Sequence, residues 1–258
     1  MIEDSSVADR LKAVFRQQAH VNESKGGPTL YARVYQTIRE ALLLGILAPG
    51  ETLSIRIVAA ALGISSMPVR EALGRLMIDG ALDSLPNRAF RIPLTSAQQY
   101  HELLLMRLRL ETLAGEHAAI RIQPRQLTHL RHCFDMLTAN ENSNASLTDY
   151  LTSHRRFHFE IYKIAQMPRV YNAIETLWLR VGPLFNEASS TFSYRDKVIY
   201  HADIYRAMET CNPKAASVAI ENDIMSMGQR TLQFLDEKGR ATDPAPIESQ
   251  RKRVADVD

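Results

Sequence analysis

The sequence contains few residues that crosslink a chain or interrupt regular structure. Its 258 residues include 2 cysteines, 1 tryptophan, 11 glycines and 11 prolines. Such a low cysteine count excludes a disulfide framework, so we expect free thiols in a reducing compartment. No apolar run reaches the length of a membrane span, and the first residues lack the basic and apolar regions of a signal peptide. We therefore expect a cytoplasmic protein without a membrane segment.

Neither sign of charge is in large excess. The chain carries 31 basic and 29 acidic side chains, which gives a formal net charge of +2. Any binding of nucleic acid must then depend on where the basic residues lie and not on the total charge. The hydrophobic content of 45% is ordinary for a globular protein. Strand-like alternation is rare, so the pattern predicts a mainly α fold.

One stretch has the pattern of a helix-turn-helix. A first helix is predicted from Leu53 to Leu62, and Gly63 supplies the residue that a tight inter-helix turn needs. Ser65 or Ser66 can cap the following helix at its N-terminus. The first turn of that helix tolerates Pro68, because the missing N–H would have no intrahelical acceptor there.

The second helix of this pair separates apolar from charged side chains. Val69, Leu73 and Leu76 fall on one face, whereas Arg70 and Arg75 lie on others. A short helix with a polar, arginine-bearing N-terminal half is the shape that enters a DNA major groove. An ordinary amphipathic helix in an α protein is the alternative, and the neighbouring segments decide between the two.

These neighbouring segments complete a winged helix. A helix with 3.6-residue apolar spacing is predicted from residue 30 to an end near Gly45, before the helix-turn-helix. Two short strands are predicted after the helix-turn-helix, at 81–85 and 90–92, with a turn at 86–89. Arg88 at the tip of this hairpin could reach a phosphate or the minor groove. Three helices followed by a β-hairpin predict a DNA-binding domain, which we call the reader domain or reader.

The same region contains an ordered series of short motifs: Gly45-x-Leu47-x-Pro49-Gly50-Glu51-x-Leu53, Leu62-Gly63-Ile64-Ser65, Pro68-Val69-Arg70-Glu71-Ala72-Leu73-x-Arg75-Leu76 and Asp79-Gly80. In this order the motifs resemble the N-terminal domain of the GntR family of bacterial transcription regulators. The resemblance implies a set of residues that contact double-stranded DNA: Arg56, Ser65, Ser66, Met67, Arg70, Arg75, Asn87 and Arg88.

Three positions depart from the family's usual pattern. The family usually has arginine where Ser66 stands, threonine where Met67 stands and glycine where Ala89 stands. Loss of an arginine removes a potential bidentate contact to guanine or a clamp on phosphate. We therefore expect an altered operator or a weaker affinity. Ala89 would be strained if the wing tip needs a positive φ.

The remaining chain predicts a helical domain. About six helices are expected over residues 95–236, with bounds near 95–122, 124–140, 146–166, 168–189, 194–210 and 213–235. A loop is expected at 140–144. The predicted fold is thus mainly α, with an N-terminal winged helix-turn-helix that includes a small β-hairpin and a C-terminal antiparallel bundle of six to seven helices. We expect four parts: an arm with a short helix (1–28), the DNA-binding domain (29–94), the helical domain (95–236) and a disordered tail (237–258).

A pair of histidines marks a candidate metal site. His154 and His158 are four residues apart in a predicted helix and so lie on the same face. This spacing can chelate one ion, although two histidines on an exposed helix also occur by chance. The domain resembles the FCD-type effector domain of the FadR subgroup, which commonly holds a metal through an aspartate, a histidine four residues on and two later histidines. His158 and His201 stand at two of these positions.

The other two ligand positions are exchanged in type. His154 stands where the subgroup has aspartate, and Asp223 stands where it has its last histidine, 22 residues after His201. The set stays at three imidazoles and one carboxylate, which Zn²⁺ or Ni²⁺ accepts in either arrangement. We predict a retained divalent metal site of these four residues. A decayed, metal-free site is the alternative.

Arg107 is the candidate effector-binding residue. The segment Met106-Arg107-x-x-Leu110-Glu111 resembles a family segment whose arginine faces the effector cavity. An arginine beside a metal with open coordination positions can capture a small carboxylate. The alternative is a pair with Glu111 on the same helix. His129, His132 and Cys133 match no family ligand, and we interpret them as surface or packing residues.

The resemblance implies a regulator that binds a short palindromic operator as a homodimer, more often as a repressor. Its helical domain would bind a small organic acid and shift the placement of the two DNA readers. Two other functions remain open: a direct metal sensor, and a metal-dependent hydrolase built on the four ligands. The hydrolase lacks a convincing general base beside the cluster and would leave the reader domain without a purpose.

Overall fold

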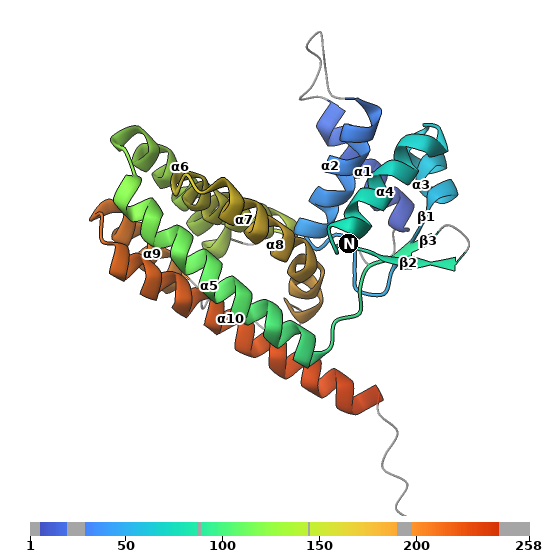
Figure 1. Ribbon diagram of the computed structural model, residues 1–258. Coiled ribbons are helices and arrows are strands. Elements are labelled where there is room, and N and C mark those ends of the chain that lie inside the picture. Colours follow the sequence, from blue (N-terminus) through green and yellow to red (C-terminus); the bar gives the residue numbers. More distant parts are fainter. Residues whose placement is uncertain (1–5, 20–28, 87–88, 144, 190–197, 243–258) are drawn as a thin grey trace, which may run out of the picture.

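The computed structural model describes residues 6–19, 29–86, 89–143, 145–189 and 198–242. Within these ranges the chain forms ten helices and three short strands. The first third of the chain lies at one side of an elongated bundle made by the last six helices (Figure 1). The predicted mainly α fold is confirmed. Among the helices of the described ranges, none is long and apolar enough to cross a membrane.

The N-terminal unit is a winged helix. Its helices and strands are α2 (Leu30–Leu43), β1 (Thr52–Ser54), α3 (Ile55–Leu62), α4 (Ser66–Ile78), β2 (Asp83–Leu85) and β3 (Ala89–Arg91). The three strands form one antiparallel sheet in the order β1-β3-β2. The helix-turn-helix and the β-hairpin therefore occur where the sequence predicts them.

One strand was not predicted. The first helix of the helix-turn-helix was expected to begin at Leu53, but it begins at Ile55 because residues 52–54 form β1 and pair with β3. This pairing satisfies backbone groups on the second edge of β3, and Leu53 opposite Phe90 is buried. Ala89 lies in β3 and is not among the described residues with positive φ, so the expected strain does not arise there. The wing-tip residues 87–88 lie outside the described residues.

Glycine and serine mark the turns as expected. Gly63 adopts a left-handed conformation with φ 68° at the end of α3, and Gly80 has φ 73° after α4. Both conformations are ones that a residue without Cβ adopts at low cost. Ser65 is the N-cap residue of α4, but its side chain makes no capping hydrogen bond. Ser65, Ser66 and Met67 are exposed, so the start of α4 lies at the surface.

A helix from the N-terminal arm packs on the winged helix. α1 (Val7–Ala19) begins after Ser6, whose hydroxyl accepts a hydrogen bond from the Asp9 amide at 3.2 Å. Leu11 and Val14 are buried, and Arg10 forms an ion pair with Glu51. α1 contacts both α2 and α3. The predicted short helix of the arm is thus part of the reader domain.

The C-terminal unit is an antiparallel bundle. Its helices are α5 (Ala97–Arg121), α6 (Pro124–Asn142), α7 (Leu147–Ile164), α8 (Pro168–Ser189), α9 (Val198–Glu209) and α10 (Pro213–Thr242). α5 and α10 run along each other for most of their length (Figure 1). A capping box between Ser96 and Gln99 starts α5. The six predicted helices are all present.

Two helix ends differ from the prediction. α10 continues to Thr242, so residues 237–242 of the expected disordered tail are helical, and Lys238 forms an ion pair with Glu187 of α8. α6 continues through Glu141, which was expected in a loop. Both extensions give polar side chains a partner on another helix, which sequence periodicity cannot show. Residues 243–258, and the expected start of a helix at 194, lie outside the described residues.

The reader domain and the bundle are in direct contact. Arg39 and Glu40 of α2 form ion pairs with Glu175 of α8 and Arg155 of α7, respectively. Gly182 of α8 faces the backbone of Leu42 and Leu43 so closely that a Cβ at position 182 would overlap the Leu42 carbonyl oxygen. α2 of the winged helix is therefore packed on two helices of the bundle, α7 and α8.

Candidate metal and effector site

Three helices bring four metal-ligating side chains together. His154 and His158 come from α7, His201 from α9 and Asp223 from α10. All four are buried, and each offers one ligand atom such that these atoms lie within 4.8 Å of one another. This is the set that the sequence predicts, and whether it holds an ion stays a prediction.

The separations within the cluster suit a tetrahedral ion. The His158 Nε2 atom lies 3.4 Å from Asp223 Oδ2, and the His201 Nε2 atom lies 3.5 Å from Asp223 Oδ1. With metal–nitrogen bonds of about 2.1 Å, the ligand atoms of a tetrahedral site are about 3.4 Å apart. The His201 Nε2 atom is buried and makes no hydrogen bond within the described structure. The geometry and the donor set therefore fit a Zn²⁺- or Ni²⁺-sized ion.

Two neighbouring residues fix the tautomers of the histidines. The His201 Nδ1 atom lies 2.7 Å from a Glu141 carboxylate oxygen, with both side chains fully buried. The His158 Nδ1 atom lies 3.3 Å from the Tyr162 hydroxyl, which itself donates to Glu111. Both Nδ1 atoms must then carry the proton and donate it. Each Nε2 lone pair is thereby directed into the cluster, as a metal ligand requires.

Glu111 joins this network to Arg107. Its carboxylate accepts hydrogen bonds from Arg107 at 2.6 and 3.3 Å, from the Tyr162 hydroxyl at 2.5 Å and from the Trp178 indole at 3.1 Å. Burial acts to lower the pKa of Arg107, but the Glu111 carboxylate outweighs it and raises the pKa. Burial, and then Glu111, raise the pKa of Tyr162. Arg107 therefore stays charged and Tyr162 stays protonated.

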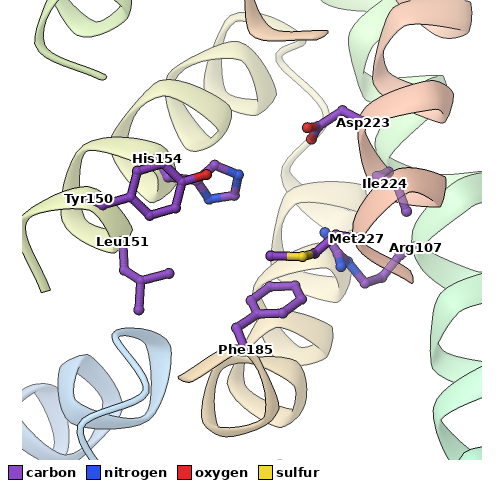
Figure 2. A pocket seen from close by; sticks show the side chains of 8 residues that line it. All are labelled: Arg107, Tyr150, Leu151, His154, Phe185, Asp223, Ile224 and Met227. Carbon is purple, nitrogen blue, oxygen red and sulfur yellow. The ribbon is translucent and has the colours of Figure 1, made fainter. Parts of the chain in front are cut away.

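A small cavity lies beside the cluster. It is lined by Arg107, Tyr150, Leu151, His154, Phe185, Asp223, Ile224 and Met227 (Figure 2). Figure 2 shows the side chains of His154, Asp223 and Arg107 directed toward a common space. The Arg107 Nη1 atom is buried and has no hydrogen-bond partner within the described ranges. The cavity has a volume of about 10 Å³, the room of about one water molecule.

Arg107 makes the predicted pair with Glu111, and its role in effector binding stays a prediction. It pairs with Glu111 on its own helix, and it also lines the cavity beside the candidate ligands. Its guanidinium lies 5.1 Å from the Trp178 ring centre and 5.4 Å from that of Phe185. The ion pair uses Nε and one terminal nitrogen, so a second terminal nitrogen remains for a ligand.

The described residues that are predicted to contact DNA are exposed on α3 and α4 of the winged helix. Arg56 on α3 is exposed, as are Ser65, Ser66, Met67 and Arg70 at the start of α4. Arg75 is further along α4 and pairs with Asp79 at 3.1 Å. Asn87 and Arg88 lie outside the described residues. The six of the eight residues that the structure describes are therefore all exposed, and their contact with DNA stays a prediction.

The residues that we excluded as ligands lie elsewhere. His129, His132 and Cys133 are on α6, and none belongs to the four-residue cluster. Cys133 is buried, with its sulfur 3.9 Å from His129 Nε2, and burial raises the pKa of its thiol. His129 also lies 3.8 Å from Glu160.

Sequence reasoning missed the residues that orient the ligands. Tyr162 follows His158 by four residues, a spacing that could have indicated it. Glu141 gave no such signal, because it is far from His201 in the sequence and was expected in a loop. Phe185 and Met227, which enclose the cavity, were also not predicted.

The two units match two protein-family models. Residues 30–92 match the model described as bacterial regulatory proteins of the gntR family, and residues 102–225 match the FCD domain. The fold and these matches define a winged-helix transcription regulator with a helical effector-binding domain. The chain belongs to the GntR family, in the FadR-like subgroup that the FCD domain distinguishes.

Similar proteins are transcription regulators. The chain is 32% identical over 155 residues to the HTH-type transcriptional regulator McbR of Escherichia coli K12, which covers 60% of this chain and 70% of that protein. It is 23% identical over 207 residues to the HTH-type transcriptional repressor RspR of the same strain, with 80% and 90% coverage. These relatives and both domains identify the chain as a regulator and not an enzyme.

Solved structures agree with this fold. The structure of E. coli McbR/YncC superposes with a TM-score of 0.74 at 25% identity and covers 82% of this chain and 99% of that one. A GntR regulator from Rhodococcus sp. RHA1 superposes with a TM-score of 0.65 at 22% identity, with 79% and 97% coverage. The winged helix and the bundle thus recur together in related regulators.

Proposed function

We propose that this GntR-family regulator binds a palindromic operator as a homodimeric repressor, and that a metal-bound small acid in the bundle changes its operator affinity. The observation that carries the proposal is the position of α7. The helix supplies His154 and His158 to the cluster, Leu151 to the cavity and Arg155 to the ion pair with Glu40 of α2. One rigid element therefore touches both the candidate effector site and the DNA reader.

The DNA-binding role is assigned to the start of α4 together with Arg56 of α3. Ser65, Ser66, Met67 and Arg70 are exposed, and the Ser65 side chain does not cap its own helix. The first N–H groups of a helix, with its positive dipole end, favour an anion such as a DNA phosphate. Arg70 adds a fixed positive charge and five donors at the same end. Arg75 and the wing residues Asn87 and Arg88 are assigned peripheral contacts.

The metal role is assigned to His154, His158, His201 and Asp223. Their support is the donor set, the separations of 3.4 and 3.5 Å and the outer partners Glu141 and Tyr162. A divalent ion would compensate the buried Asp223 charge and give a carboxylate ligand a coordination position. Zn²⁺ or Ni²⁺ fits this set.

The effector is proposed to be a small organic acid. Arg107 Nη1 is the buried donor that faces the cavity, and Glu111 holds the guanidinium in place. The cavity volume of about 10 Å³ means that an acid can enter only if a side chain such as Met227 or Phe185 changes rotamer. Thioether side chains adapt readily to such changes. The effector therefore has few heavy atoms beyond its carboxylate.

A direct metal sensor is the second candidate. The same small cavity supports it, because an ion with one bound water would fill the available space. In that case the ion alone would shift α7 and the reader.

Homodimerisation follows in both cases from the two-fold symmetry of a palindromic operator. We infer a cytoplasmic location, because a DNA-binding regulator works where the DNA is.

The test is operator binding by one preparation in three states. Operator duplexes are first selected from a random pool, and their affinity is then measured with chelator-treated protein, with added Zn²⁺ or Ni²⁺, and with metal plus candidate acids. An acid-dependent change that His158→Ala abolishes would support the proposal. A change with metal alone would favour the direct sensor. Affinity that is unchanged in all states would refute both.

A further inference from the structure

α4, the recognition helix of the proposed DNA reader, has a line of apolar residues along its exposed side, which is unusual for a surface that meets DNA. Met67, Gly74 and Ile78 are seven and eleven residues apart, so they lie within about 20° of a single line along α4. Met67 is 63% exposed and Ile78 is 73% exposed. The charged residues Arg70 and Glu71 flank this line on either side. We call these three residues the outer line of α4.

Gly74 has no packing reason to be glycine. A Cβ built at this position would meet no atom of the described residues within 4 Å, apart from its own helix backbone and chain neighbours. Glycine in a helix interior is less favourable than alanine, because it costs more backbone entropy. Since the described part of the chain leaves this space open, we infer that the missing side chain serves something that approaches from outside. On a recognition helix that object is the DNA duplex.

Met67 presents a large apolar group at the end of α4 that enters the groove. Its thioether offers no strong donor or acceptor, so it cannot read the polar pattern of guanine, cytosine or adenine. The apolar group that a base edge exposes in the major groove is the C5-methyl of thymine. Ser66 beside it is exposed and has a short side chain.

We propose that the outer line of α4 makes this protein selective for thymine. Met67 packs on a thymine methyl group in each operator half-site, and Gly74 lets the helix approach the groove closely enough for that contact. This inference rests on the proposed operator binding and adds the chemistry of the bases that are read. Specificity at this base pair then depends on the contact between Met67 and the thymine methyl group. A side chain with hydrogen-bonding groups at the same position would select another base.

The test replaces thymine by uracil, which has the same hydrogen-bonding groups but lacks the methyl. Duplexes that the full-length protein enriches from a random pool are resynthesised with each thymine changed in turn to uracil. Removing the methyl at the contacted position should weaken binding about fourfold, the effect of losing one buried methyl group. Met67→Ala should bind both duplexes alike. Met136→Ala, which removes an exposed methionine on α6, should keep the difference.

Gly74→Ala tests the close approach separately. The variant should fold normally and bind the selected operator at least tenfold more weakly. Gly239→Ala is the matched control, because Gly239 on α10 also has open space around its Cα. It should bind as the unchanged protein does.

The outcomes separate the inference from the proposed function. If the pool yields no enriched duplex, operator binding itself is wrong and the inference fails with it. If duplexes are enriched but no thymine-to-uracil change matters, or Met67→Ala keeps the difference, thymine reading is wrong while operator binding stands. If Met67→Ala instead changes the oligomeric state measured by sedimentation, the outer line is a protein contact and the inference is overturned.

Discussion

At the residue scale, Glu111 holds the site together. It is fully buried, and its carboxylate accepts hydrogen bonds from Arg107, Tyr162 and Trp178. Through Arg107 it reaches the cavity, and through Tyr162 it reaches the ligand His158. A buried charge of this kind is tolerated only because its partners satisfy it. Glu111 therefore positions both the candidate effector residue and a candidate ligand.

Glu111→Gln should lower the free energy of unfolding by about 3–5 kcal/mol, because it leaves the buried Arg107 charge unpaired. Urea unfolding measures this change. Asp135→Asn is the matched control, since Asp135 pairs with Arg131 at 2.8 Å on the surface, with 54% of its side chain exposed. That variant should lose no more than about 0.5 kcal/mol. Similar losses in both variants would contradict the role given to Glu111.

The sequence predicted the contacts of some single residues and not of others. The intrahelical pair of Arg107 with Glu111 is present, and effector binding by Arg107 stays a prediction, because one guanidinium has enough donors for two partners. Glu141 could not be predicted, since only the packing of α6 against α9 brings it to His201. The wing-tip residues Asn87 and Arg88 stay a prediction.

At the scale of elements, local chemistry predicted the helices well. Ser96, Pro124 and Pro168 stand at helix starts, and Gly63 ends α3, because capping and proline chemistry act within one turn of the chain. β1 was missed because three residues carry no periodicity, and it exists only through its pairing with β3. The extra length of α10 brings Lys238 to Glu187 of α8, a contact that sequence periodicity does not show.

The contact between α8 and α2 depends on a glycine. Gly182→Ala should place a Cβ against the Leu42 carbonyl and push the two helices apart. We expect a loss of about 1–3 kcal/mol in the free energy of unfolding, measured by denaturant unfolding. Gly239→Ala, at an open position on α10, should be neutral or slightly stabilising. An equally stable Gly182→Ala protein would mean that α2 and α8 are not packed in this way.

At the scale of the whole molecule, the reader and the effector domain are joined at α2. Arg39 and Glu40 pair with α8 and α7, and the latter helix carries two of the four candidate ligands. Binding can shift an equilibrium only by the difference in affinity for the two states. A ligand that moves α7 would change the energy of these contacts and thus the placement of the reader.

Arg155→Gln should uncouple the two domains. The variant removes the ion pair with Glu40 but no candidate ligand and no DNA contact. Because the pair is partly exposed, operator affinity without effector should change by less than about fivefold. The response to metal and acid, measured as the ratio of operator affinities, should fall toward one. Arg131→Gln on α6 is the control and should keep the full response; an unaltered response in Arg155→Gln would place the coupling elsewhere.

The account as a whole depends on whether the cluster of three histidines and one aspartate binds an ion. The sequence predicted these residues through a family resemblance with two exchanged positions, and the packing of α7, α9 and α10 brings them together. The most direct measurement is elemental analysis of untagged protein prepared without chelators, alongside His158→Ala. We predict about one Zn or Ni per chain in the unchanged protein and a large loss in the variant. No bound metal, with none taken up from added Zn²⁺ or Ni²⁺, would contradict the account.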